Sequence, residues 1–273
     1  MDTMPQSKPD KPSGSAAETA DWHERVVQRS LRSAKKRSID RGSSLIRAAA
    51  KLLERSNGDG FTVQDVADEA GQSLRTLYQY FESKDDLLLA VFEEAMRTYA
   101  GMIRNAIVDL SDPLERLGGA IVAAVRMPEF SGTGVDRGLA RLRLKLSEVE
   151  PDLVARSQEP VTALMRGLVA DAAASGQVSA GDPQEATYMI MALKSAFITS
   201  RTLGNDTAVR LPTVFTLTSF CLEGLGASFD EAWLDAVSAK LRMPDRIGLA
   251  PPSRPKRSGG ATRKPPAPAP APT

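Results

Sequence analysis

Residues 62–84 carry two short helical patterns separated by a glycine, and this arrangement constrains the fold more than any other part of the chain. The first pattern places apolar residues at helical spacing, namely Val63, Val66, Ala67 and Ala70. Thr62, followed three residues later by Asp65, can cap its start. Gly71 can end it, because glycine adopts positive φ at low cost. Two short helices joined by a tight glycine-containing turn are the plan of a helix-turn-helix.

The second pattern separates an apolar face from a polar one. Ser73 can cap this helix, and Leu74, Leu77 and Phe81 share its inner face. The outer face holds residues able to contact base pairs: Arg75, Thr76, Gln79 and Tyr80, with Tyr78 at the edge. Arginine can pair with guanine, glutamine with adenine, and a threonine methyl group can touch thymine. An ordinary solvated helix would show the same polar residues, so periodicity alone leaves both interpretations open.

Lys84 falls at the first position of the next helix, which Ser83 and Asp86 can cap. The helix dipole disfavours a cation there by roughly 0.3–1 kcal/mol. A bound phosphate would reverse that cost, because helix N-termini and lysine both attract phosphate. A surface lysine also tolerates so small a penalty, and this remains the alternative.

The rest of the chain is patterned as helices. Apolar residues at helical spacing predict a helix that starts near Ile39 and ends before Asn57, and a long helix from Ser83 to about Ile107. Proline positions and helix caps predict further helices near 113–126, 136–147, 151–175, 183–203, 211–226 and 229–241. No segment alternates convincingly with period two. We therefore expect an all-α fold.

The two ends of the chain have compositions that cannot build a core. Residues 24–41 hold seven basic residues against two acidic ones, and residues 250–273 hold eight prolines and five basic residues. We expect a disordered arm at 1–37, basic from about residue 24, and a disordered Pro-rich basic tail at 245–273. Between them we expect a DNA-binding domain at 38–98 and a helical domain at 99–244. The basic arm would reach along the minor groove or the phosphates.

Composition excludes several function classes. Cys221 is the only cysteine, so the chain has no intramolecular disulfide, and His23 is the only histidine. A histidine-based metal site or a Ser/His/Asp triad is close to excluded, and we expect neither enzymatic activity nor a cofactor. The net charge is +1, so DNA affinity must come from a local patch. No apolar run is long enough to span a bilayer and no signal peptide is visible, so we expect a cytoplasmic protein.

A resemblance to the tetracycline-repressor (TetR) family rests on a dense pattern: Thr62-Val63-x-Asp65-Val66-Ala67-x-x-Ala70-Gly71-x-Ser73-x-x-Thr76-Leu77-Tyr78-x-Tyr80-Phe81-x-Ser83-Lys84-x-x-Leu87. The resemblance covers about 50 residues, from near Ile39 to Leu88. It implies a three-helix, helix-turn-helix DNA-binding domain joined to an α-helical regulatory and dimerisation domain.

The resemblance also implies roles for individual residues. The expected DNA-binding residues are Thr62, Val63, Gln72, Ser73, Arg75, Thr76, Tyr78, Gln79, Tyr80 and Lys84. Thr62 and Val63 would lie near the DNA backbone, and Tyr78 and Lys84 would bind phosphates. Gln72 departs from the family pattern, because many members carry an apolar residue there. It would either loosen the turn slightly or place an amide near DNA.

In the later helices the family encloses an effector pocket and forms its dimer interface. The helices near 183–203 and 211–226 carry apolar residues around most of their circumference, which suits a homodimer interface or, alternatively, the core of one subunit. Met165, Met189 and Met191 would line an adaptable pocket or simply fill the core. We interpret the run Arg141-x-Arg143-x-Lys145 as a solvated helix face. Nothing in the sequence identifies the effector.

The expected function is therefore a homodimeric repressor that binds a near-palindromic operator in double-stranded DNA and is released by a small molecule. An activator would share every one of these features. Two further possibilities are a small-molecule-binding helical protein with a vestigial helix-turn-helix, and a protein that coats DNA non-specifically through its basic ends.

Overall fold

The computed structural model describes residues 15–56, 60–131, 133–204 and 212–243, and these segments contain ten helices and no strand. The all-α prediction is confirmed. The N-terminal helices are α1 (Ser15–Arg55), α2 (Val63–Ala70), α3 (Leu74–Tyr78) and α4 (Lys84–Ala106). The later helices are α5 (Pro113–Ser131), α6 (Thr133–Val149), α7 (Pro151–Ala174), α8 (Pro183–Leu203), α9 (Val214–Gly224) and α10 (Glu231–Ala239). Helices α2 to α10 lie where the sequence predicts helices, with ends that differ by a few residues.

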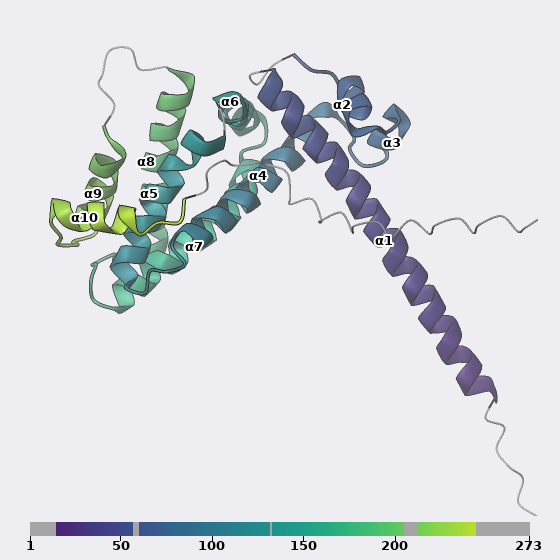
Figure 1. Cartoon of the computed structure of the whole chain (residues 1–273), viewed down its shortest axis with the longest axis horizontal. Helices are drawn as coiled ribbons and strands as arrows, with labels where there is room; N and C mark the ends of the chain where they lie inside the picture. Colours follow the sequence, from purple (N-terminus) through teal and green to yellow (C-terminus); the bar gives the residue numbers. More distant parts are fainter. Residues whose placement is uncertain (1–14, 57–59, 132, 205–211, 244–273) are drawn as a thin grey trace, which may run out of the picture.

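Helix α1 differs from the expectation. Its 41 residues begin at Ser15, and its N-terminal half projects away from the rest of the molecule (Figure 1). The prediction of a disordered arm is therefore wrong for residues 15–37. Between Ser15 and Arg41 the chain has neither proline nor glycine and is rich in Ala, Glu, Gln, Lys and Arg, which have high helix propensity. Residues 1–14 and the expected tail at 245–273 lie outside the described residues.

Two hydrophobic clusters form the core. One belongs to the N-terminal domain and includes Leu45, Val66, Leu77 and Leu87, all fully buried. The other lies among α4, α5, α7, α8 and α9, with Ile121 and Met165 among its most buried members. The first apolar residue predicted for the N-terminal helix, Ile39, is exposed, and α1 enters the core only from Leu45 onward.

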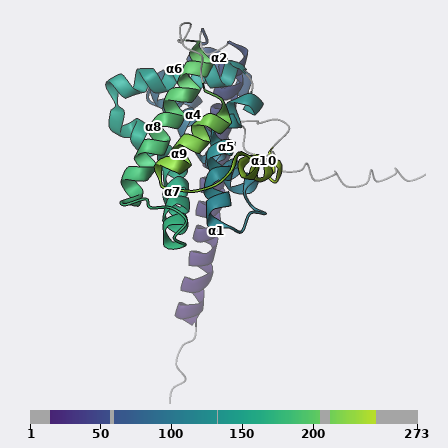
Figure 2. The same ribbon diagram turned by 90° about the vertical axis from the view of Figure 1, so that its left-hand side faces the viewer.

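Helices α4 and α6 belong to both halves. Met96 and Tyr99 of α4 pack against both clusters. Helix α6 contributes Leu139, Leu142 and Leu146 to the N-terminal cluster, although the sequence pattern places it in the second domain. Figures 1 and 2 show α6 near the upper end of α1, and in Figure 1 α7 runs along α4 and α8 runs beside α5. No helix in the described segments is long and apolar enough to cross a membrane.

Candidate nucleic-acid interface and internal cavity

The start of α2 is fixed by a complete capping box. The Thr62 amide donates to Asp65 Oδ2 over 2.7 Å, and the Asp65 amide donates to Thr62 Oγ1 over 3.2 Å. The hydrogen bonds from Thr62 hold the pKa of Asp65 below its usual value. At the other end, Gly71 has φ of 64°, which glycine adopts without strain, and its amide bonds back to Asp68. The predicted caps and turn are confirmed, and they fix where α3 begins.

Helix α3 is only five residues long, and Ser73 caps it through the Thr76 amide. Leu77 anchors it in the core, while Arg75, Tyr78 and Gln79 are exposed at the outer edge of the molecule (Figure 1). Gln79 follows the last helical residue and caps the C-terminus. The predicted polar face therefore exists, and its three most exposed side chains are those that can reach a base pair or a phosphate.

Two of the residues expected to contact DNA also have partners within the protein. The Tyr80 ring is partly buried against α1, close enough that a Cβ on Gly42 would lie 3.5 Å from it. The Thr76 hydroxyl is hydrogen-bonded to Ser73 Oγ over 2.8 Å. Val63, also expected near the DNA backbone, is partly buried against the N-terminal cluster, whereas Thr62 is exposed.

Gln72 is a structural tie that the sequence did not reveal. Its amide nitrogen donates to the Arg41 carbonyl of α1 over 3.1 Å. The side chain thus fastens the turn to α1 instead of loosening it. Its carbonyl oxygen is buried and has no hydrogen-bond partner within the described residues.

Lys84 points toward the protein. Its ammonium donates to the Phe61 carbonyl and lies 4.6 Å from the centre of the Phe61 ring. These contacts offset the unfavourable position at the start of α4 without any phosphate. A phosphate contact by Lys84 stays a prediction, and the ammonium would need to share its protons or leave Phe61 to make it.

Basic residues extend the polar face along α1. A shallow groove between α1 and the turn is lined by Arg41, Arg47, Gln72 and Thr76. Further along α1, one side of the helix carries basic residues at intervals of four, three and four: Arg25, Arg29, Arg32 and Lys36. The positive charge is therefore local, as the small net charge requires. A helix is about 10–12 Å wide and the minor groove about 6 Å, so this segment cannot enter the minor groove as a helix.

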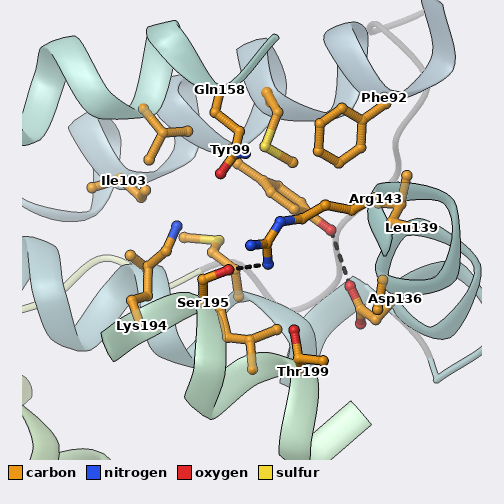
Figure 3. Close-up of a pocket in the computed structure, with 16 residues that line it drawn as sticks. Phe92, Tyr99, Ile103, Asp136, Leu139, Arg143, Gln158, Lys194, Ser195 and Thr199 are labelled. Atoms are coloured by element: carbon orange, nitrogen blue, oxygen red, sulfur yellow. Dashed lines mark hydrogen bonds between the residues drawn. The ribbon is translucent and has the colours of Figure 1, made fainter. Parts of the chain in front are cut away.

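The second half of the protein encloses a cavity among α4, α5, α6, α7 and α8 (Figure 3). Its volume is about 90 Å³. Much of the wall is apolar, including Phe92, Met96 and Leu139. Its polar side chains are Tyr99, Asp136, Arg143, Gln158, Lys194, Ser195 and Thr199.

Polar groups inside the cavity form two hydrogen-bonded pairs. The Tyr99 hydroxyl donates to Asp136 Oδ1 over 3.0 Å, and Asp136 is buried. The Arg143 guanidinium donates to the Ser195 hydroxyl of α8. Desolvation lowers the pKa of Lys194 to about 8, and the nearby charge of Arg143 adds to the effect.

Two sequence interpretations of this region need correction. Arg143 lies in the cavity and not on a solvated face, although Lys145, two residues on, is exposed and paired with Asp85 over 2.6 Å. Of the two interpretations of Met165, Met189 and Met191, the pocket interpretation does not hold, because none of the three lines the cavity. Met165 is fully buried in the core, Met191 packs against it, and Met189 is 61% exposed. Met96 and Met127 line the cavity in their place.

Comparisons with known proteins agree with this geometry. Residues 45–91 match the model of the family described as bacterial regulatory proteins, tetR family. The HTH-type transcriptional regulator HbdR of Aromatoleum sp. (strain CIB) is 36% identical over 84 residues, which are 31% of this chain and 37% of that protein. The match thus covers little more than a third of HbdR. The fatty acid metabolism regulator protein of Bacillus subtilis (strain 168) is 26% identical over 151 residues, covering 54% of this chain and 75% of that protein.

Solved structures extend the likeness to the second half as a likeness of fold. RolR in complex with resorcinol superposes with a TM-score of 0.55 at 17% identity, covering 77% of this chain and 98% of RolR. FadR from Bacillus subtilis in complex with stearoyl-CoA gives a TM-score of 0.52 at 21% identity, covering 68% of this chain and 98% of FadR. In sequence, residues 45–91 of this chain therefore match the family of bacterial regulatory proteins, tetR family, and in fold the described residues resemble RolR and FadR.

Proposed function

We propose that this protein is a sequence-specific DNA-binding transcriptional regulator. It acts as a homodimer on a near-palindromic operator, represses transcription and is released by a small molecule. The observation that carries the proposal is the exposed set of Arg75, Tyr78 and Gln79 on a helix-turn-helix whose caps and ties fix it to the core. Arginine and glutamine are the side chains that pair bidentately with guanine and adenine in the major groove.

The experiment begins with a DNA library of random sequence, from which the full-length protein selects its site. Arg75→Ala combined with Gln79→Ala should abolish binding to the selected site and leave the helical circular dichroism spectrum unchanged. Arg104→Ala combined with Asn105→Ala removes an arginine and a carboxamide from exposed positions outside the helix-turn-helix and outside α8 and α9, and should bind normally. Retained operator affinity in the Arg75/Gln79 variant would falsify the reading surface.

Competition separates this function from its rivals. Specific binding survives an excess of unrelated DNA, whereas a protein that coats DNA loses its target under the same conditions. A vestigial helix-turn-helix would select no sequence at all. Repression and activation differ in the position of the operator, so a promoter–reporter assay decides between them.

Exposed apolar side chains support the homodimer. Tyr188 and Met189 of α8 are 72% and 61% exposed, and Phe215 and Phe220 of α9 are 40% and 66% exposed. Both helices lie at the side of the molecule away from α1 (Figures 1 and 2). Large apolar side chains gathered on one side of a soluble protein mark an interaction surface. A second copy of the chain would cover them and place two recognition helices on one operator.

A charge substitution tests that interface. Phe220→Glu should convert the dimer to a monomer in analytical ultracentrifugation, because it buries a carboxylate against apolar side chains. Val108→Glu is the matched control, since Val108 is 57% exposed and lies outside α8 and α9. A dimer that survives Phe220→Glu would place the interface elsewhere.

Helix α6 suggests how a ligand in the cavity would reach the DNA-binding half. One side of α6 packs Leu139, Leu142 and Leu146 into the N-terminal cluster, and Arg143 faces the cavity. Helix α4 carries Lys84 at its first residue and Met96 in the cavity wall. A ligand that displaces α4 or α6 would therefore disturb the N-terminal cluster to which both helices contribute.

A further inference from the structure

The cavity contains two positive side chains that approach from different helices. Arg143 comes from α6 and Lys194 from α8, and both are partly buried. Figure 3 shows the guanidinium and the ammonium pointing into the same space between the helices. Burying like charges together is unfavourable, because each loses its hydration while they repel one another. Such an arrangement needs a negative partner to become favourable.

The protein supplies only part of that partner. Among the described residues that line the cavity, Asp136 is the one acidic side chain, and one of its oxygens already accepts the Tyr99 hydroxyl proton. The ionisable residues of the lining therefore leave one uncompensated positive charge. Within the described part of the chain, the Arg143 Nε is buried and has no hydrogen-bond partner. A buried guanidinium N–H without an acceptor costs free energy, and a ligand that accepts from it would remove that cost.

Lys194 is the second partly buried positive charge in the cavity wall. Its pKa falls to about 8 because the ammonium is desolvated and because Arg143 repels it. A lysine kept for structure alone would normally reach water or pair with a carboxylate. Together with its position in the cavity wall beside Arg143, the lowered pKa of Lys194 makes this lysine a candidate ligand contact.

The remaining wall is suited to an apolar group. Phe92, Met96, Ile103 and Leu139 line the space beside the two cations. Ligand sites in proteins usually have volumes of about 300–1,000 Å³, so the 90 Å³ of this cavity admits only a small ligand unless the wall moves. An inorganic ion would leave the apolar side chains without a partner.

We propose that the effector is a small organic monoanion, whose acid group binds between Arg143 and Lys194 and whose apolar body packs against Phe92 and Met96. A carboxylate fits best, because it accepts two hydrogen bonds in the plane of a guanidinium. This inference rests on the proposed function only in calling the bound acid an effector, that is, the molecule that releases the regulator from DNA. Binding of the acid in the cavity does not depend on DNA binding.

Matched acid and amide pairs test the charge directly. Benzoate and benzamide share one shape, and so do hexanoate and hexanamide, so each pair differs mainly in the negative charge. Isothermal titration calorimetry of the full-length protein without DNA should show each acid binding at least about tenfold more tightly than its amide, since charge-assisted hydrogen bonds are the stronger kind. Phenyl phosphate, a dianion, should bind more weakly than benzoate, because the lining offers one net positive charge.

Three variants locate the charge. Arg143→Gln and Lys194→Gln should each remove the preference for the acid, and the fold is checked by circular dichroism. Lys145→Gln is the control, because Lys145 lies on α6 but outside the cavity. The wild-type comparison of acid with amide stands even if one variant fails to fold.

Four results would overturn the proposal. They are equal affinity for acids and amides, no binding of either acid, an acid preference that survives both cavity variants, and tighter binding of phenyl phosphate than of benzoate. The DNA-binding function is tested in a separate experiment, and it fails if the ligand-free protein selects no operator from the DNA library. A protein that binds acids but selects no DNA would retain this inference and lose the proposed function.

Discussion

Replacing Lys194 with methionine should stabilise the unliganded protein. The pKa of Lys194 falls from an ordinary 10.5 to about 8, chiefly through desolvation and further through Arg143. A fall of about 2.5 pKa units corresponds to roughly 3 kcal/mol against the charged form. Lys194 keeps some exposure, and solvent screening reduces that figure to about 1–2 kcal/mol. Methionine has a similar length and needs no hydration, so Lys194→Met should recover this free energy at neutral pH.

The sign of the pH dependence follows from the direction of the shift. Below pH 8 Lys194 is charged in both the folded and the unfolded chain, and its full cost is present. Between about pH 8 and 10.5 the unfolded chain binds more protons, so the stability of the wild type rises with pH. Arg143 and Asp136 are the other charged residues that line the cavity. The advantage of Lys194→Met should therefore shrink as the pH rises through 8.

Thermal unfolding at fixed protein concentration measures both effects. A gain of about 1–2 kcal/mol should raise the melting temperature of a chain this long by roughly 2–8 °C. Lys145→Met is the control, because Lys145 is exposed and its ion pair with Asp85 contributes little. A melting temperature lowered by Lys194→Met, or a gain that is the same at pH 7 and pH 10, would refute the reasoning that Lys194 is held at a cost.

Three further predictions concern other parts of the chain. Cys221 is buried and desolvation raises the pKa of its thiol to about 11, so 5,5′-dithiobis(2-nitrobenzoate) should label it only as fast as the protein unfolds; rapid labelling of native protein would contradict this. Thr62→Ala should lower the free energy of unfolding in urea by about 1 kcal/mol because it removes the capping box, whereas Thr62→Ser should retain most of it. Deleting residues 1–36 should weaken operator binding and make the plot of log affinity against log salt less steep. The steepness should fall by about 0.9 for each phosphate that the shortened α1 no longer binds. An unchanged slope would show that the basic side of α1 does not touch DNA.

The sequence predicts helices and their ends well, because the signals are local. The capping box of Thr62 and Asp65, the positive φ of Gly71 and the caps at Ser73 and Ser83 each depend on residues at most four positions apart. Contacts between helices carry no such signal. The hydrogen bond from Gln72 to the Arg41 carbonyl joins residues 31 positions apart, and the Lys84 contact with the Phe61 carbonyl spans 23. Neither protein contact can be predicted from the sequence, because the residues that form it lie far apart along the chain.

Helix α1 shows a different limit. Its exposed half has the composition of a disordered polar segment and also that of a good helix, and composition alone does not separate the two. The helical alternative is favoured because this segment continues an existing helix. The buried Leu45 and Leu53 already nucleate α1, so the helix extends N-terminally without the cost of a new nucleus. The extension runs through Gly42, a single glycine within α1, and then meets no further glycine or proline until Gly14 and Pro12.

Helical geometry could have predicted that Arg143 points into the protein, although it stands in a run of basic residues that suggests a solvated face. Arg141, Arg143 and Lys145 alternate along the sequence, and alternation on a helix places neighbours roughly 200° apart. They cannot share one solvated face. Leu139, Leu142 and Leu146 define the buried side of α6, and Arg143 lies one turn from Leu139 and three residues before Leu146. An arginine is ordinarily expected at an exposed position, but its spacing from the buried leucines places Arg143 beside the buried face of α6. An arginine at such a position requires an acceptor, and the described part of the fold supplies only the Ser195 hydroxyl for one of its donors.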